Sequence, residues 1–391
     1  MYGLVLTAGG ARGAYQAGVL RRIGELNRTD RTSPFRIVAG ASAGAINGIA
    51  IAAGSGNFRG MTDYLAEVWS SLSTESVYHT NITAYMKVAR TLVQDLSLGG
   101  IVGGGQLQSL LDATPLRAFL GEKLKFDALA TEIERGNLYA IAISATNYFS
   151  GKSYTFIQGQ KGHPVWEKSR RVALAATLTL DHLCASTAIP VVFQPVPIRT
   201  PHGAFYFGDG AMRLTNTLSP AIRLGSTHLL AIGIRHQAKT ETQLQDQYIS
   251  FGSDGMTMKK PPLAQVMGVM FNSMFLDHLD ADLEHLARIN TIIASNTFDY
   301  QTLKEPIQPF QTLALYPSID LGQIAHACRP KAPPIIRYLL DGLGSQSQES
   351  SDLLSYLLFH KSYIQELIAL GYSDANARID EIEHFLTMRE T

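Results

Sequence analysis

Three short motifs in this chain contain residue types that can perform acyl-transfer chemistry, and the first is built around a serine. Ser42 lies in the pentapeptide Gly40-Ala-Ser-Ala-Gly44, directly after the apolar run Ile37–Ala39. This pattern is typical of a nucleophile elbow, in which a strand turns sharply into a helix and exposes the serine hydroxyl. Glycines at both ends allow the close approach of strand and helix that the turn requires. The alternative is a buried helix, rich in glycine and alanine, in which the serine is incidental.

The second motif is a glycine loop one strand earlier. The apolar segment Tyr2–Leu6 predicts a first strand, and the loop 9–13 leads into a helix that we expect to begin near Gly13. Backbone N–H groups of such a loop can bind a nucleotide phosphate, a dinucleotide pyrophosphate or the oxyanion of a tetrahedral intermediate. A P-loop would need a following Gly-Lys-Ser/Thr, and no convincing acidic residue closes a second strand as in a dinucleotide site. The nearby serine therefore favours the oxyanion.

The third motif is an aspartate at the end of an expected strand. Asp209 follows the apolar segment Ala204–Phe207 and is flanked by two glycines. A carboxylate in this position can point out of the end of a sheet, where the serine turn is also expected. An ordinary Asp-Gly turn has the same sequence pattern, and the motif alone does not separate the two.

Composition limits the class of protein. The chain has 391 residues, of which 46% are hydrophobic and only 17% are charged, against roughly 25% charged residues in typical soluble domains. Such a surface permits contact with an oily substrate or a membrane. Lysine plus arginine and aspartate plus glutamate balance at 33 each, which argues against a nucleic-acid-binding surface. The two cysteines, Cys184 and Cys328, exclude a disulfide framework and a cysteine-based zinc site.

The elements that must position these motifs alternate between strands and helices. Further strands are predicted at Leu138–Ser144, Lys152–Ile157, Thr227–Ile234 and Gln311–Pro317, and helices at Phe58–Ser71, Val172–Leu178, Ala264–Ala294 and from Pro334 onward. The glycine cluster Gly99–Gly105 is expected to be a loop, with a lid hinge as the alternative. We expect no signal peptide and no transmembrane helix, and by default a cytoplasmic protein with peripheral membrane contact as an option.

Taken together, the motifs resemble those of the patatin-like phospholipases in their order and context. The matching segments are Gly9-Gly10-x-Arg12-Gly13, Gly40-x-Ser42-x-Gly44 and Asp209-Gly210-Ala211, and Ala185–Pro190, Asn216 and Pro220 are similar to further parts of that family. The resemblance covers roughly residues 3 to 235, and the combination is more specific than any single motif. One departure is Ala8, which replaces the first glycine of the family's Gly-x-Gly-x-x-Gly loop and cannot adopt a positive φ cheaply.

The resemblance implies a three-layer α/β fold with a central, mainly parallel sheet flanked by helices. A catalytic domain would span residues 3–235, and a mostly helical C-terminal extension, 236–391, would pack on it. It also implies a Ser-Asp dyad: Ser42 attacks an acyl carbonyl, Asp209 accepts its proton, and water hydrolyses the acyl-enzyme. The oxyanion loop would consist of Gly9, Gly10, Ala11, Arg12 and Gly13, with Gly40, Gly44, Gly210 and Ala211 supporting the motifs.

The implied substrates are phospholipids, lysophospholipids or other acyl esters, with peripheral membrane contact and no nucleic acid as partner. No metal or other cofactor enters the scheme, and no histidine is required. A soluble carboxylesterase or an acyltransferase with the same dyad is the alternative among enzymes. A non-catalytic nucleotide-binding module that uses the glycine loop is the alternative from another class. The sequence leaves the oligomeric state open.

Overall fold

The computed structural model describes residues 1–26, 32–79, 109–236, 263–275, 278–295, 308–342 and 351–388. The glycine cluster at 99–105, with its lid alternative, lies outside these ranges.

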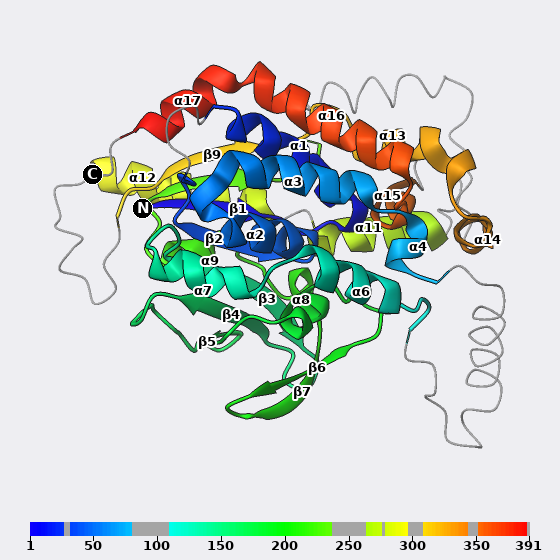
Figure 1. The fold of residues 1–391 in the computed structure, drawn as a ribbon, viewed down its shortest axis with the longest axis horizontal. Helices are drawn as coiled ribbons and strands as arrows, with labels where there is room; N and C mark the ends of the chain where they lie inside the picture. The colour runs from blue at the N-terminus through cyan, green and yellow to red at the C-terminus, as the bar shows by residue number, and fades with distance from the viewer. Residues whose placement is uncertain are drawn as a thin grey trace.

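A mixed sheet forms the centre of the described chain (Figure 1). Its strands are β1 (Tyr2–Leu6), β2 (Ile37–Ala41), β3 (Ala140–Asn147), β4 (Ser153–Gly159), β5 (Arg171–Ala175), β6 (Val196–Thr200), β7 (Gly203–Asp209), β8 (His228–Ile232) and β9 (Gln311–Leu315). The order is β5-β4-β3-β2-β1-β8-β9, and the hairpin of β6 and β7 pairs with the end of β3. The strands from β3 through β2, β1 and β8 to β9 are parallel, whereas β4 and β7 pair antiparallel with β3. The predicted mainly parallel sheet is thereby confirmed.

Helices cover both faces of this sheet. In the first half of the chain they are α1 (Gly13–Gly24), α2 (Ala43–Ala53), α3 (Phe58–Ser71), α4 (Thr74–Val77), α6 (Thr114–Lys123), α7 (Asp127–Glu134) and α8 (Leu180–Ser186). The others are α9 (Ser219–Arg223), α11 (Leu263–Phe275), α12 (His278–Ser295), α13 (Leu321–Cys328), α14 (Pro334–Gly342), α15 (Ser351–Leu357), α16 (Lys361–Ala377) and α17 (Ile379–Thr387). None of the described helices is both long and apolar enough to cross a bilayer.

Two apolar layers follow from the alternation of side chains along the buried strands. On β1, Leu4 and Leu6 belong to one cluster with residues of α1, α2 and α3, whereas Val5 belongs to a second cluster with residues of α9 and α12. A strand that is buried on both faces reads as a continuous apolar run, because successive side chains point to opposite faces. The sheet with helices on both sides is the three-layer arrangement that was expected.

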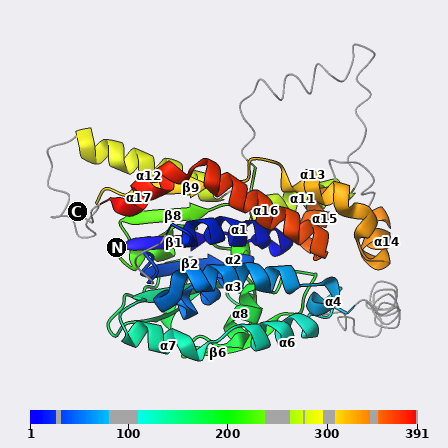
Figure 2. The ribbon, with the colours of Figure 1, turned by 45° about the horizontal axis from the view of Figure 1, so that its top comes forward.

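The C-terminal helices pack on the N-terminal ones. Figures 1 and 2 show α16 running beside α1 and α3. Gly18 on α1 and Gly371 on α16 permit this close contact, because a Cβ atom at either position would collide with the backbone of the other helix. The C-terminal part of the chain also supplies β9, which extends the sheet beside β8.

Two predicted elements need correction. The segment Val172–Leu178 is not a helix: most of it belongs to β5, which pairs in parallel with β4. A short apolar run fits a buried helix or a buried strand equally well, and the pairing partner decides. The predicted helix Ala264–Ala294 is described as two helices, α11 and α12, on either side of residues 276–277, which lie outside the described ranges.

The strand register brings the serine and aspartate motifs to the same end of β3. Ala41, the residue before Ser42, pairs with Ser144, and Asp209 pairs with the next residue of β3, Ala145. The two motifs are 167 positions apart in sequence (209 − 42), but they meet on the same side of β3, opposite β4, because β2 runs parallel to β3 and β7 runs antiparallel to it. The sheet therefore positions both side chains.

Candidate active site

Ser42 occupies a sharp turn between β2 and α2. Its backbone angles are φ 53° and ψ −126°, and among the non-glycine residues that the structure describes only Ser42 and Val191 have a positive φ. An L-residue in this region is strained and is held there by its surroundings. The Ser42 N–H group donates to the Ser186 hydroxyl (2.9 Å), which in turn donates to the Ser144 carbonyl (2.7 Å). This chain of bonds fixes the turn to α8 and β3, and the geometry is that of a nucleophile elbow.

The two glycines of the elbow lie where backbone segments come into close contact. A Cβ atom on Gly44 would collide with the carbonyl groups of Leu6 and Thr7, and one on Gly40 would collide with the backbone of Gly44. Only glycine therefore lets α2 begin so close to the ends of β1 and β2. This is the close strand–helix approach that the sequence pattern predicts.

Asp209 lies at the end of β7, fully buried. Its backbone is held by two bonds: the N–H group donates to the Ala188 carbonyl (2.9 Å), and the carbonyl accepts from the Thr146 hydroxyl (2.7 Å). In the side chain, Oδ1 accepts from the Ala211 N–H group (2.9 Å). The second oxygen, Oδ2, is buried and has no hydrogen-bond partner among the described residues.

Burial raises the pKa of the Asp209 carboxyl from 3.8 to about 7, because desolvation disfavours the charged form. The Ala211 N–H group and the nearby Ser42 hydroxyl favour the charged form and so work in the opposite direction. The Ser42 hydroxyl is thus close enough to affect the carboxyl, although the pair does not meet the geometry of a formed hydrogen bond, as the unpaired Oδ2 shows. A carboxyl that titrates near neutral pH beside a serine hydroxyl is suited to exchange a proton with it.

The glycine loop reaches the same region through Gly10. Gly10 has φ 55° and lies against the Tyr356 carbonyl, so a side chain is excluded on both grounds. Gly10 and Ala43, the first residue of α2, line one pocket together with Ser42. Ala8 is buried without a positive φ, so the replacement of the usual glycine introduces no backbone strain.

Arg12, which belongs to the same loop, is buried against the C-terminal part of the chain. Its Nη2 atom donates to Asp352 Oδ1 (2.9 Å), its Nε atom donates to the Ser355 hydroxyl (2.8 Å), and its guanidinium lies 4.3 Å from the centre of the Tyr356 ring. Asp352 Oδ2 also accepts from Asn272 on α11 (2.8 Å). The side chain of Arg12 therefore fastens the loop to α15.

A buried polar network, which the sequence motifs do not reveal, fastens the loop to α2 and α3. Asn47 on α2 donates to the Gly13 carbonyl (3.0 Å) and to Gln16 Oε1 (2.9 Å), and accepts from the Trp69 indole (2.7 Å). Gln16 in turn donates to the Thr7 carbonyl (2.9 Å). The signal in the sequence is a lone polar residue, Asn47, within an otherwise small and apolar helix.

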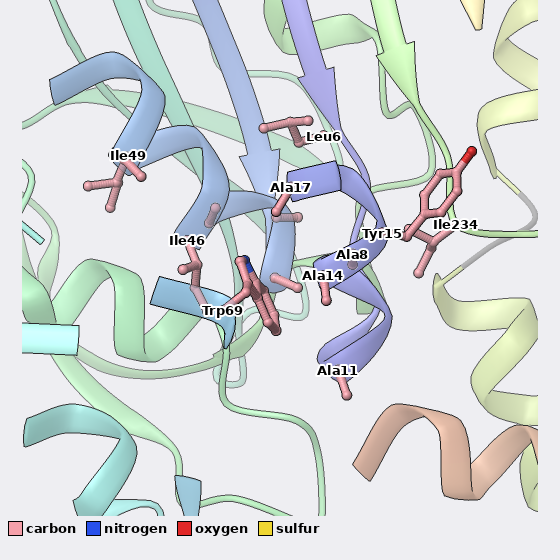
Figure 3. Packing of buried hydrophobic residues seen from close by; sticks show 14 of the residues in the cluster. Leu6, Ala8, Ala11, Ala14, Tyr15, Ala17, Ile46, Ile49, Trp69 and Ile234 are labelled. Atoms are coloured by element: carbon pink, nitrogen blue, oxygen red, sulfur yellow. The ribbon is translucent and has the colours of Figure 1, made fainter. Parts of the chain in front are cut away.

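The pocket in front of Ser42 is narrow and almost entirely apolar. Its lining residues are Gly10, Ser42, Ala43, Ile46, Val68, Trp69, Leu72, Leu116, Phe119, Leu120, Thr187, Ile189, Phe193 and Phe359. The space between them is about 490 Å³, part of it open to solvent. In Figure 3, the Trp69 side chain of this lining lies between Ile46 and Ala14. None of the lining residues is charged or a histidine.

The structure thus brings Ser42, Asp209, Gly10 and Ala43 together at one end of the sheet. The turns around them are supported by Gly40, Gly44, Gly210 and Ala211. In the glycine loop, a Cβ atom on Gly9 would collide with Ile234, and one on Gly13 would collide with Ala43. Ser186, Ala43 and Asn47 are added to the site by the structure. Ser186 lies in the segment Ala185–Pro190, which is one of the segments whose sequence resembles the patatin-like phospholipases.

Comparison with known proteins gives a family and a set of similar folds. The model of the family "Patatin-like phospholipase" matches residues 4–222, and no curated protein matches the sequence.

Three solved structures are among those to which the chain is similar. VipD from Legionella pneumophila is 13% identical with a TM-score of 0.33, over 97% of this chain and 67% of VipD. Human GIVD cytosolic phospholipase A2, in complex with methyl gamma-linolenyl fluorophosphonate, is 12% identical with a TM-score of 0.41, over 99% of this chain and 59% of the human protein. ExoU of Pseudomonas aeruginosa, in its complex with SpcU, is 15% identical with a TM-score of 0.28, over 63% of this chain and 47% of the other. The chain thus covers less than two thirds of the length of the latter two.

Proposed function

Because this chain belongs to the patatin-like phospholipase family, we propose that it is a serine acyl-ester hydrolase of lipids, of the phospholipase A or lysophospholipase type. Ser42 is the nucleophile and Asp209 is its base. The observation that carries this proposal is the pairing of a strained, pocket-facing serine with a buried carboxyl whose Oδ2 has no described hydrogen-bond partner. Such an oxygen is free to accept the serine proton.

The reaction has two steps in this proposal. The Ser42 hydroxyl attacks the acyl carbonyl while its proton passes to Asp209, and the proton then leaves with the alcohol of the lipid as the ester bond breaks. Water next attacks the acyl-enzyme and gives a proton to Asp209. This proton passes to the Ser42 oxygen as the acyl–serine bond breaks, which releases the fatty acid and the free serine. The oxyanion of both tetrahedral intermediates is stabilised by backbone N–H groups of the glycine loop and of Ala43.

The shape of the pocket supports a long acyl chain as substrate. Its walls are aliphatic and aromatic, and they begin directly beside Ser42. An apolar chain next to Ser42 would place the carboxyl ester at the pocket's polar end. The same walls argue against a nucleotide at the glycine loop, because no lining residue carries a positive charge for a phosphate.

Product analysis on defined lipids tests the proposal. The full chain is incubated with phosphatidylcholine and with lysophosphatidylcholine, and released fatty acid is measured by mass spectrometry beside the Ser42→Ala and Asp209→Asn proteins. We expect the native protein to release fatty acid, and we expect each substitution to reduce the rate of release by at least about a hundredfold. Release that persists in Ser42→Ala would refute the assignment of the nucleophile, and added glycerol as acceptor would reveal an acyltransferase.

A further inference from the structure

Three large aromatic side chains are exposed at the β3–β4 turn and on the β6–β7 hairpin, next to Asp209. Phe149 is 83% exposed, Tyr206 is 61% exposed and Tyr148 is 41% exposed, and together they are three of the four exposed large aromatic residues in the described chain, the fourth being Tyr338. Tyr148 lies opposite Tyr206, and Phe149 stacks on Phe205, so Phe149 lies on one face of the hairpin and the two tyrosines lie on the other. We call the three residues, which cover both faces of the hairpin, the aromatic patch. Exposed apolar side chains are ordinary when scattered, but clustered aromatic residues mark an interaction surface.

The aromatic patch is rigid. The Phe149 ring stacks on Phe205 with 5.5 Å between ring centres, and the Tyr148 N–H group donates to the Tyr206 carbonyl (3.0 Å). The turn that carries Phe149 is fixed by Asn147 Oδ1, which accepts from the N–H groups of Phe149 and Ser150, each at 2.9 Å. A preorganised surface loses little conformational entropy when it binds.

The charges around the aromatic patch are basic. Arg199 pairs across the hairpin with Ala204 and so lies on the same face as Tyr206, and the Arg213 Nε atom donates to the Gly151 carbonyl (2.8 Å). Neither arginine forms an ion pair with a described residue, whereas Lys152 at the turn pairs with Glu167 (3.5 Å). The sequence contains no aspartate or glutamate between Asp181 and Asp209. Aromatic rings with arginines at their edge fit the headgroup region of an anionic bilayer.

The aromatic patch is connected to the pocket of Ser42 by a second hollow. This hollow, of about 900 Å³, is lined by Val196 and Pro197 of the hairpin, and it shares Leu116, Thr187 and Phe193 with the pocket in front of Ser42. Pro197 pairs with Tyr206. In Figure 1 the β6–β7 hairpin projects from the sheet on the side opposite α16 and α17. The hollow beside the hairpin therefore adjoins the pocket of Ser42, and Leu116, Thr187 and Phe193 border both.

We propose that the β3–β4 turn and the β6–β7 hairpin form the surface with which this protein docks on an anionic lipid bilayer. The hairpin enters the interface edge-on, so that Phe149 on one face and Tyr206 on the other both insert, and Arg199 and Arg213 contact the anionic headgroups. The orientation presents the hollow beside Pro197 to the lipid. The role of this surface in delivering lipid to Ser42 rests on the proposed function, whereas the binding of the surface to the bilayer does not depend on catalysis.

Vesicle sedimentation tests the docking surface without turnover. The Ser42→Ala protein is mixed with vesicles of phosphatidylcholine alone or with added phosphatidylglycerol, and the bound fraction gives the affinity. We expect tighter binding with phosphatidylglycerol, a loss of tenfold or more for Phe149→Ser with Tyr206→Ser, and a loss of about fivefold for each arginine changed to glutamine, since each basic residue contributes about 1 kcal/mol. The matched controls are Tyr338→Ser and Arg59→Gln, exposed residues elsewhere, which should bind like the parent.

Each outcome decides between docking and its alternatives. Equal binding to vesicles by the patch variants and the control variants would overturn the proposal. A dimer in analytical ultracentrifugation that the patch variants abolish would also overturn it, because the aromatic patch would then be covered by a second copy of this chain. On the Ser42-intact background, the patch variants should lose hydrolysis of vesicle lipid but retain hydrolysis of a short soluble ester. If the native protein hydrolyses no ester, the proposed function fails while the binding result still stands.

Discussion

The pH dependence of Ser42 acylation follows from the burial of Asp209. The carboxyl must be ionised to accept the serine proton, and its pKa is raised to about 7. The acylation rate should therefore be half-maximal near pH 7 and fall about tenfold for each further unit of pH, to about one hundredth of its plateau at pH 5. An unburied carboxylate would instead place this midpoint near pH 4.

The assay is a single-turnover reaction with an excess of a fluorophosphonate, followed as the loss of free Ser42. The hydrolysis of the reagent without protein corrects for its own pH dependence. Asp209→Asn should lower the plateau by about 10² to 10⁴ and remove the titration. A midpoint near pH 4, or a midpoint near 7 that persists in Asp209→Asn, would refute the assignment of Asp209 as the base.

The same pKa predicts an effect on stability with a definite sign. Between pH 3.8 and about 7 the folded carboxyl holds a proton that the unfolded chain has released. The free energy of unfolding therefore falls as pH rises, by about 1.4 kcal/mol per unit and about 4 kcal/mol in all. The Asp209→Asn protein lacks this titrating group. From pH 5 to pH 8, the free energy of unfolding of the native protein, measured in urea, should therefore fall by about 3 kcal/mol relative to that of the variant. Asp63→Asn, whose side chain is exposed on α3, is the control and should show no such difference.

Other parts of the site give further predictions. Arg12→Met should lower the free energy of unfolding by about 3 kcal/mol in urea denaturation, because it breaks a buried ion pair, whereas Arg21→Met, whose pair with Asp63 is exposed, should cost less than about 1 kcal/mol. Leu116→Trp should shorten the preferred acyl chain, with a loss of about fourfold in kcat/KM for each methylene that no longer fits; an unchanged chain-length profile would place the acyl group elsewhere. Ester hydrolysis should persist in every single His→Ala protein and in a metal chelator, and a folded histidine variant without activity would contradict the dyad.

The local parts of this architecture are predictable from the sequence. The segments Tyr2–Leu6 and Phe58–Ser71 have the bounds that their apolar patterns predict, and the turn at Ser42 follows from its flanking glycines. These features depend on neighbouring residues only. The helix predicted at Val172–Leu178 is wrong because the short apolar run there fits the periodicity of a helix and of a strand equally well. The segment forms a strand because it pairs with β4.

The parts that escape sequence reasoning depend on contacts between distant residues. Ser186, 144 positions from Ser42, holds the N–H group of the nucleophile, and nothing in its own surroundings announces this bond. The partners of Arg12 lie 340 positions or more along the chain, on α15. The pKa of Asp209 is likewise set by the packing around it, which sequence spacing does not contain.

The covalent modification of Ser42 tests the central claim most directly. The native protein is treated with a fluorophosphonate at pH 8, digested, and its adduct located by tandem mass spectrometry, with Ser42→Ala and Asp209→Asn treated in parallel. The proposed mechanism predicts one adduct on Ser42, none in Ser42→Ala, and greatly slowed labelling in Asp209→Asn. An adduct on a different residue, or a folded native protein that remains unlabelled, would contradict it.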